Sequence, residues 1–261
     1  MSKKDKVIFL GNGPLAEYAL NIIERECQVI FHARRKEDLE EVKRLKLENP
    51  DAHAVLASFG VLIPDSVLKQ FEPEGILNIH PSLLPLYRGA SPIESAILAG
   101  DSDFSVSVMK LAKAMDAGPI YFQTTLSGLP LRKNDIYKAL AETGAKWVVD
   151  NLTNLSEPVL QDDTKATYCG KLDKSMSLLT PEVDTAEKTL RKIVAFQGYP
   201  KPKYEFFDTP CIILEAHLKE TKEVAELSIP CADGNVVVVN KLQPEGRKVM
   251  DAKAFLNGYK K

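Results

Sequence analysis

The sequence has few cysteines and no long apolar run, and each shortage excludes a class of protein. The cysteines are scattered, without C-x-x-C spacing, at Cys27, Cys169, Cys211 and Cys231. This spacing argues against a zinc ribbon and against a disulfide framework. No apolar stretch approaches the length of a bilayer-spanning helix, and the apolar run before the first glycine is too short for a signal peptide. We therefore expect a reduced, cytoplasmic protein with no membrane contact.

A strong charge of either sign is also missing. Lysine and arginine number 34 and aspartate and glutamate 36, which gives a formal net charge of −2 at pH 7. Any contact with nucleic acid must therefore come from a local patch and not from the field of the whole protein. With 261 residues, of which 44% are hydrophobic and 27% charged, the chain can form one large globular domain or two smaller ones.

Apolar runs and helical patterns alternate through the first half of the sequence. Residues 7–10 form a short apolar run, and residues 14–26 follow with a helical pattern in which Leu15, Ala19 and Ile23 share a face. The alternation continues as far as a long helical pattern that ends near residue 152. It predicts an α/β fold over residues 1–152, a Rossmann-like domain with a doubly wound, mostly parallel sheet.

The second half follows a different pattern. The periodicity fades over residues 153–180, which are polar and rich in turn residues, and we interpret this segment as a linker. Residues 181–261 begin with one helical pattern and continue with short apolar runs separated by turns. They predict a smaller C-terminal β-domain, a barrel or a sandwich, with an OB-like barrel among the options.

A glycine motif follows the first predicted strand. Residues 11–16, GNGPLA, fit the loose dinucleotide-binding pattern G-x-G-x-x-A. Pro14 lacks the backbone N–H that would bind a pyrophosphate, and the acidic residue that would hold a ribose is missing until Glu37. Arg34 and Arg35 stand there and could hold a 2′-phosphate. An NADP site therefore remains an alternative to an ordinary strand-to-helix turn.

A polar pair lies at the end of another predicted strand, in the stretch GILNIHPSLLPLYRG at 75–89. Asn78 and His80 are two residues apart, so their side chains point to the same face of the sheet. Ligands of open parallel sheets bind beyond the carboxyl ends of the strands. An amide and an imidazole together supply a hydrogen-bond donor for a carbonyl oxygen and a titratable group, which suits acyl transfer. The alternative is that both side chains only end the strand.

A carboxylate is available as a partner for this pair. Asp116 lies in a turn after the predicted strand at 104–111, with a glycine and a proline close behind it. A carboxylate near His80 would orient the imidazole and raise its pKa, favouring the protonated form near neutral pH. An ordinary Asx turn is the alternative role for Asp116.

These segments resemble the folate-dependent formyltransferases. The resemblance is carried by NIHPSLLPLYRGASPIESAILAGD at 78–101 and by MDAGPI at 115–120. It implies that Asn78, His80 and Asp116 are the catalytic set. It also implies that 10-formyltetrahydrofolate is the formyl donor. The folate would lie against the loop 82–89 and the segment 55–64, with contacts from Ser82, Leu83, Leu84, Pro85, Phe59 and Gly60.

The second half resembles the methionyl-tRNA formyltransferases within that group. The matching stretches are TYCGKLDKS at 167–175, RKIVAFQGYPKPKYEF at 191–206 and LQPEGRKVM at 242–250. The resemblance implies formyl transfer to the α-amino group of methionyl-initiator-tRNA during translation initiation, by a monomer. No metal is expected, because the histidines do not cluster with cysteines or carboxylates at ligand spacing.

One departure from that family concerns the grip on tRNA. The basic, glycine-rich insertion usual after the second strand is missing, and Arg34, Arg35 and Lys36 remain as a small basic cluster. With Lys201 and Lys203 they are the candidate tRNA contacts. Two alternatives stay open: a sugar-nucleotide N-formyltransferase with the same folate chemistry, and an NADP-binding or RNA-binding protein without enzymatic activity.

Overall fold

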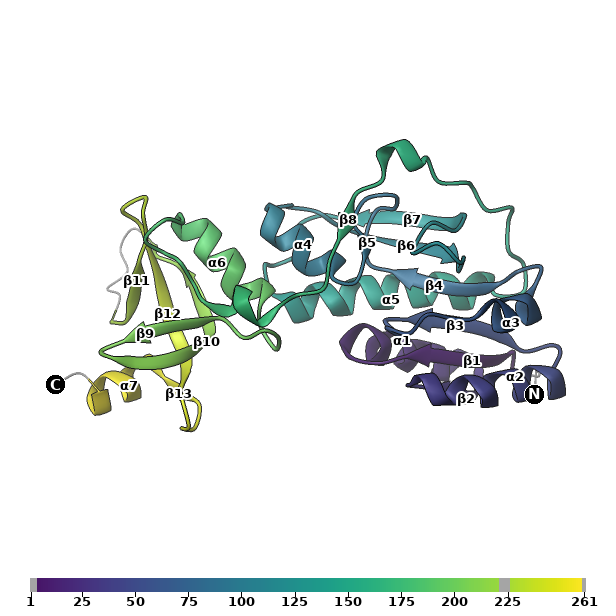
Figure 1. Ribbon diagram of the computed structural model, residues 1–261, viewed down its shortest axis with the longest axis horizontal. Helices are drawn as coiled ribbons and strands as arrows, with labels where there is room; N and C mark the ends of the chain where they lie inside the picture. Colours follow the sequence, from purple (N-terminus) through teal and green to yellow (C-terminus); the bar gives the residue numbers. More distant parts are fainter. Residues whose placement is uncertain (1–3, 221–225, 260–261) are drawn as a thin grey trace. The chain divides into compact units, whose positions relative to one another are not determined.

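A computed structural model describes residues 4–220 and 226–259 (Figure 1). The chain divides into two compact units. The first comprises Met1–Ile93 and Ser102–Gly170, and the second comprises Glu94–Asp101 and Lys171–Lys261. Of the helices in the described residues, none is both long enough and apolar enough to cross a membrane.

A six-stranded sheet forms the centre of the first unit, with strand order β2-β1-β3-β4-β6-β7. The first four strands in this order are parallel, whereas β6 runs antiparallel to both of its neighbours, β4 and β7. The predicted fold class, a doubly wound and mostly parallel sheet, is confirmed. The strands are β1 (Lys6–Gly11), β2 (Gln28–Ala33), β3 (His53–Ala57), β4 (Ile76–His80), β6 (Phe104–Lys110) and β7 (Ile120–Leu126).

Helices cover the sheet on both faces. On one face α1 (Pro14–Glu26) packs beside α5 (Lys133–Asn151). On the other face η1 (Lys36–Asp38) leads into α2 (Leu39–Glu48), and α3 (Asp65–Leu68) leads into η2 (Lys69–Phe71). Alternate residues of each strand pack against the helices on opposite faces, because successive side chains of a strand point to opposite sides of the sheet. Ile8 and Leu10 of β1, for example, share a buried cluster with the α2 residues Leu39 and Val42.

The position of α5 decides which way the polar pair points. Gly144 of α5 lies so close to the sheet that a Cβ atom built there would be 2.6 Å from Ile79 Cγ2 and 3.1 Å from Val106 Cγ2. Ile79 of β4 therefore faces α5. Asn78 and His80, its neighbours along the strand, face the opposite side of the sheet.

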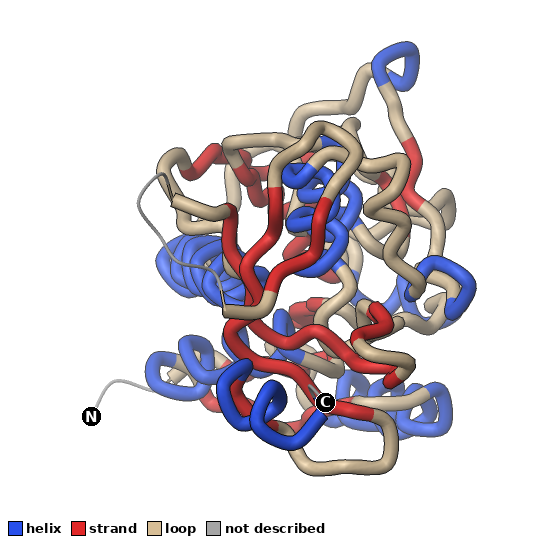
Figure 2. The backbone as a smooth tube through the Cα atoms, turned by 90° about the vertical axis from the view of Figure 1, so that its left-hand side faces the viewer, coloured by secondary structure: helices blue, strands red, loops and turns tan. Residues whose placement is uncertain are grey.

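Two loop segments lie close to the polar pair at the end of β4. The residues after β4 form a loop that contains β5 (Arg88–Gly89), and β5 pairs in parallel with β8 (Tyr168–Cys169). The chain from 153 to 167 is mostly irregular and includes η3 (Asp163–Lys165), the single turn at the top of Figures 1 and 2. Of the segment 153–180, which the sequence presents as a linker, residues up to Gly170 group with the first unit and residues from Lys171 with the second.

The second unit is built on an antiparallel sheet with the order β11-β12-β10-β9, and β13 also pairs with β12. Helix α6 (Ala186–Ala195) packs on β10 and β12. The core of this unit includes Ile213, Val237, Val239 and Phe255. This arrangement confirms the small β-domain predicted from the short apolar runs. Its other elements are η4 (Lys174–Ser177), β9 (Lys203–Phe206), β10 (Thr209–Leu218), β11 (Ser228–Pro230), β12 (Val236–Pro244), β13 (Met250–Asp251) and α7 (Ala252–Tyr259). Helix α4 (Pro92–Ala99) begins in the first unit and continues into the second.

Candidate functional site

The polar pair is buried at the end of β4. Asn78 and His80 are each only 5% exposed. Their partners across the antiparallel β4–β6 ladder are Met109 and Ser107, and residues that pair directly across such a ladder share a face. Two neighbouring strands therefore place four side chains on the face that points away from α5, and three of the four are polar.

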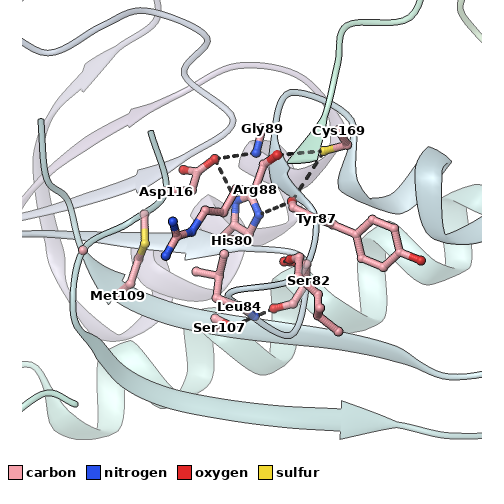
Figure 3. Close-up of polar contacts among 12 residues, drawn as sticks. His80, Ser82, Leu84, Tyr87, Arg88, Gly89, Ser107, Met109, Asp116 and Cys169 are labelled. Carbon is pink, nitrogen blue, oxygen red and sulfur yellow. Dashed lines mark hydrogen bonds and ion pairs between the residues drawn. The ribbon is translucent and has the colours of Figure 1, made fainter. Parts of the chain in front are cut away.

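His80 is held between two oxygen acceptors (Figure 3). Its Nε2 lies 3.1 Å from the carbonyl oxygen of Tyr87, and its Nδ1 lies 3.8 Å from Oδ2 of Asp116. A carbonyl oxygen can only accept, so Nε2 carries a proton and donates it to Tyr87. The Nδ1 atom faces the carboxylate at a distance that is longer than a hydrogen bond.

The expectation that His80 is protonated near neutral pH is wrong. Burial lowers the pKa of His80 below its usual value, because the charged ring loses its hydration, and this effect outweighs Asp116 and the Tyr87 carbonyl, which both raise the pKa. The ring at rest is therefore neutral, with its proton on Nε2 and a lone pair on Nδ1. His80 can take up a proton on the side where Asp116 would stabilise the resulting charge.

Asp116 is brought to His80 by a loop with an unusual backbone. Its φ angle of +50° lies in the left-handed region, which residues other than glycine rarely adopt. The Oδ2 atom that faces His80 also accepts a hydrogen bond of 2.8 Å from the backbone N–H of Gly89. The structure thus brings Asp116 and His80 together, as the sequence predicts, and Gly89 orients the carboxylate between them.

Asn78 differs from its neighbours because its side chain is unpartnered. Within residues 4–220 and 226–259 its amide makes no hydrogen bond, although the residue is 5% exposed. The amide atoms keep contact with solvent, so they do not require a partner within the protein. Its N–H groups are therefore available to a carbonyl or oxyanion of a ligand, and its position two residues from His80 places a donor and a proton acceptor side by side.

A network of short hydrogen bonds fixes the loop that follows β4. The hydroxyl of Ser107 donates to the carbonyl oxygen of Ser82 at 2.6 Å and accepts from the N–H of Leu84 at 3.1 Å. Gln123 on β7 donates to the Leu84 carbonyl at 2.8 Å, and Ser82 donates through its own hydroxyl to the Leu86 carbonyl at 2.6 Å. The loop is therefore rigid at Ser82 and Leu84, while the side chain of Leu83 is 40% exposed.

The other predicted folate contacts lie after β3. Phe59 is buried in the core that β1 and β3 share with α2, whereas Gly60 is exposed and has a φ angle of +68°. A Cβ atom built on Gly60 would meet no atom within 4 Å. Phe59 therefore supports this turn from within, and Gly60 leaves open space above it.

The glycine motif near the N-terminus has a packing explanation. A Cβ atom on Gly11 would lie 2.3 Å from the carbonyl oxygen of Ala57 and 2.8 Å from Cβ of Ala16. Gly11 is thus required by the close approach of β1 to β3 and α1, independently of any dinucleotide.

The basic residues are exposed, and one of them is partly engaged. Arg35 pairs with Asp38 at 3.4 Å, and the same carboxylate accepts the backbone N–H groups of Arg34 and Arg35. Lys36 begins η1, and Lys201 and Lys203 lie on the surface of the second unit.

No group of three or more histidine, cysteine or acidic side chains in the described part of the chain is arranged to hold a metal ion.

Two residues near the site carry no signal that the sequence reveals. Arg88 is buried at 2% exposure, and its guanidinium donates to Gln161, which in turn donates to the backbone of the Asp116 loop. Gln161 lies in the polar segment interpreted as a linker, so its periodicity and composition gave no reason to select it. The burial of Arg88, which only the structure shows, is what points to this network, because guanidinium groups are rarely buried without a partner.

Comparison with known proteins gives consistent results for both units. Residues 1–152 match the formyl transferase family, and residues 172–260 match its C-terminal domain. A methionyl-tRNA formyltransferase from Dictyoglomus thermophilum is 31% identical over 268 residues, which cover 95% of this chain and 83% of the relative.

Two solved structures have the same fold. HypX from Aquifex aeolicus, in complex with tetrahydrofolic acid, superposes with a TM-score of 0.77 at 18% identity, over 100% of this chain and 48% of that one. WlaRD, a sugar 3N-formyl transferase solved in the presence of dTDP and 5-N-formyl-THF, has a TM-score of 0.65 at 15% identity, over 95% of this chain and 100% of that one. Because family models match both units and a relative is 31% identical over 95% of this chain, the chain belongs to the formyl transferase family.

Proposed function

We propose that this formyltransferase transfers the formyl group of 10-formyltetrahydrofolate to the α-amino group of methionyl-initiator-tRNA. The observation that supports the chemistry is an unpartnered amide on the same strand face as a neutral imidazole, which itself faces the carboxylate of Asp116. The acceptor is inferred from the similarity of the whole chain to methionyl-tRNA formyltransferases.

Asn78 is proposed to stabilise the charge that develops on the formyl oxygen. The unprotonated amine of the acceptor attacks the formyl carbon, and the carbonyl oxygen becomes an oxyanion as the carbon turns tetrahedral. An amide N–H aimed at that oxygen stabilises the transition state more than the ground state. The lack of another partner for the Asn78 side chain supports this role, because no existing hydrogen bond must break first.

His80 and Asp116 are proposed to handle the proton. The attacking nitrogen loses a proton as the new C–N bond forms, and the lone pair on Nδ1 of His80 can accept it. The resulting imidazolium is then held between the Tyr87 carbonyl and the Asp116 carboxylate. When the bond between the formyl carbon and the folate nitrogen breaks, His80 gives this proton to the leaving nitrogen, which restores the neutral imidazole.

The folate is proposed to bind between the loop after β4 and the turn after β3. Ser82, Leu83, Leu84 and Pro85 form the first wall, and Gly60 forms the second with Phe59 supporting it from within the core. The rigidity of the first wall, the exposed Leu83 side chain and the open space at Gly60 support this placement. A preformed apolar surface costs little ordering when a flat ring system binds.

The contact with tRNA is proposed to be modest. Arg34, Arg35 and Lys36 in the first unit, and Lys201 and Lys203 in the second, would each neutralise a phosphate at most. The join between β2 and α2 consists of residues 34–38 alone, which leaves no room for a long basic insertion. We therefore expect a weak dependence of tRNA affinity on salt.

A second acceptor class is supported by one observation. The fold covers the full length of a sugar 3N-formyl transferase, and the short join after β2 fits an enzyme that does not wedge a loop into tRNA. A sugar-nucleotide amine would use the same Asn78, His80 and Asp116.

The decisive experiment offers the enzyme formyl-labelled folate with methionyl-initiator-tRNA and with amino-sugar nucleotides, side by side. We expect label on methionyl-tRNA, with loss of transfer in His80→Ala and Asp116→Ala while folate binding is kept. Label on the sugar alone would reject the tRNA proposal and leave the chemistry standing. Transfer to neither acceptor by a folded, folate-binding protein would reject both.

A further inference from the structure

The Asp116 loop needs support that the two adjoining strands do not provide. Its left-handed backbone at Asp116 is an unfavourable conformation for a side chain-bearing residue, and it persists only where the surroundings hold it. On one side the loop is pressed against β6, since a Cβ atom on Gly118 would lie 1.8 Å from the Lys110 carbonyl oxygen.

Gln161 holds the other side. Its Nε2 donates to the backbone carbonyl of Asp116 at 2.8 Å and to that of Gly118 at 2.7 Å. One amide group thus bridges the two carbonyls that flank the turn. It fixes the peptide from which the Asp116 carboxylate projects toward His80.

Arg88 fixes the orientation of that amide. The guanidinium donates to Oε1 of Gln161 from Nε at 3.1 Å and from Nη2 at 2.7 Å. Because arginine has only donors, Oε1 must face it, and Nε2 must then face the carbonyls. Arg88 is 2% exposed, and it also donates to the Tyr168 hydroxyl at 3.5 Å and to Asp163 at 2.6 Å, whose side chain is 78% exposed.

Three consecutive residues of the loop after β4 close this network around the site. Tyr87 supplies the carbonyl for His80 Nε2, Arg88 supplies the guanidinium for Gln161, and Gly89 supplies the N–H for the Asp116 carboxylate. We propose that Gln161 is a positioning residue for Asp116, and that Arg88 orients Gln161 for this role. The proposal rests on the proposed use of His80 and Asp116 in formyl transfer.

The inference predicts an effect on rate and on the titration of His80. Asp116 raises the pKa of His80 against the effect of burial. A carboxylate that is free to move away raises it less, so the pKa of His80 should fall further when Gln161 is lost. A misplacement of about 1 Å at a catalytic group can cost about a hundredfold in rate. The KM for the substrates should change little, because the hydrogen bonds of Gln161 are all within the protein.

Two variants separate the contacts of Gln161. Gln161→Met keeps the length of the side chain and its neutrality but removes both donors and the acceptor. Gln161→Glu keeps an acceptor for Arg88 but cannot donate to the Asp116 and Gly118 carbonyls. Asp163→Asn is the matched control, since it removes the exposed ion pair of Arg88 and leaves all bonds of Gln161 in place.

The test measures kcat and KM for formyl transfer to whichever amine accepts label, and the pKa of His80 by NMR. Both Gln161 variants should lower kcat by about 10- to 100-fold with KM nearly unchanged. Gln161→Met should also lower the pKa of His80, whereas Asp163→Asn should match the wild type in every measurement. The NMR measurement needs no acceptor, so it tests the inference even if methionyl-tRNA is not the substrate.

Wild-type kcat and an unchanged His80 pKa in folded Gln161 variants would overturn the inference and leave Gln161 a structural tie of the 153–170 segment. If Gln161→Met does not fold, Gln161→Glu decides the question through kcat alone, because it retains the contact with Arg88. A drop in kcat for Asp163→Asn equal to that for Gln161→Glu would also count against the inference. It would show that the arginine environment, and not the donation to the Asp116 loop, controls the rate.

Discussion

Replacement of Asn78 by alanine should nearly abolish formyl transfer without destabilising the protein. Loss of one oxyanion donor typically costs about 3–4 kcal/mol of transition-state stabilisation, which is a drop in kcat of about 10²- to 10³-fold. Most buried polar residues cannot be removed without a loss of stability, because their partners are left unsatisfied. Asn78 has no such partner among the described residues.

The change in stability follows from the same observation. Because the amide keeps contact with solvent and has no partner among the described residues, its removal leaves no hydrogen-bonding group unsatisfied, and the cost is limited to the packing lost from a small side chain. We expect the free energy of unfolding of Asn78→Ala to stay within about 1 kcal/mol of the wild type, or about 2–4 °C in Tm.

Ser107 provides the matched comparison, since it lies on the same face of the neighbouring strand and is fully hydrogen-bonded. Ser107→Ala leaves the Ser82 carbonyl and the Leu84 N–H without their shared partner. It should lower stability by about 1–3 kcal/mol, and so Tm by several degrees, while kcat is largely kept.

The assay combines saturating formyl-transfer kinetics with thermal unfolding of both variants. We expect Asn78→Ala to have a low kcat and a Tm near that of the wild type. We expect Ser107→Ala to keep most of its kcat and to have a lower Tm. A lower Tm for Asn78→Ala than for Ser107→Ala, combined with a retained kcat, would refute the assignment of Asn78 as a donor kept free for substrate.

Other measurements test the protonation states, the ligand and the acceptor. Burial lowers the pKa of both His53 and His80, so below about pH 6.5 the unfolded chain binds protons that the folded chain does not. The free energy of unfolding, measured by urea titration, should therefore decrease as the pH is lowered from 7.5 to 5.5. The decrease should be smaller in His53→Gln, and an equal decrease in that variant would contradict the prediction. A folate analogue at 100 times its Kd should stabilise the protein by about 2.7 kcal/mol in thermal unfolding, whereas NADPH should leave Tm unchanged, and the reverse outcome would favour the dinucleotide alternative. Neutralising Arg34, Arg35 and Lys36 together should raise KM for methionyl-tRNA and reduce its salt dependence by up to about 0.7–0.9 in log–log slope per lost phosphate contact, with kcat kept; a drop in kcat alone would speak against a binding role.

The amino-acid sequence by itself determined the order of the elements and the fact that the two polar side chains share one face of the sheet. Hydrophobic periodicity is a local property, so the strand ILNIH and the alternation of Asn78, Ile79 and His80 could be predicted before any contact was known. The sequence also indicated the family, because motifs from both halves of the chain matched it.

The protonation state of His80 and the support of Asp116 were decided only by the tertiary structure. A pKa depends on burial and on charges brought from distant parts of the chain, and the burial of His80 outweighs the carboxylate that the sequence had pointed to. The role of Gln161 could not be predicted from the sequence for the same reason. Its role depends on meeting Arg88 and the Asp116 loop in space, and a polar residue in an irregular segment carries no periodic signal of contacts formed across the fold.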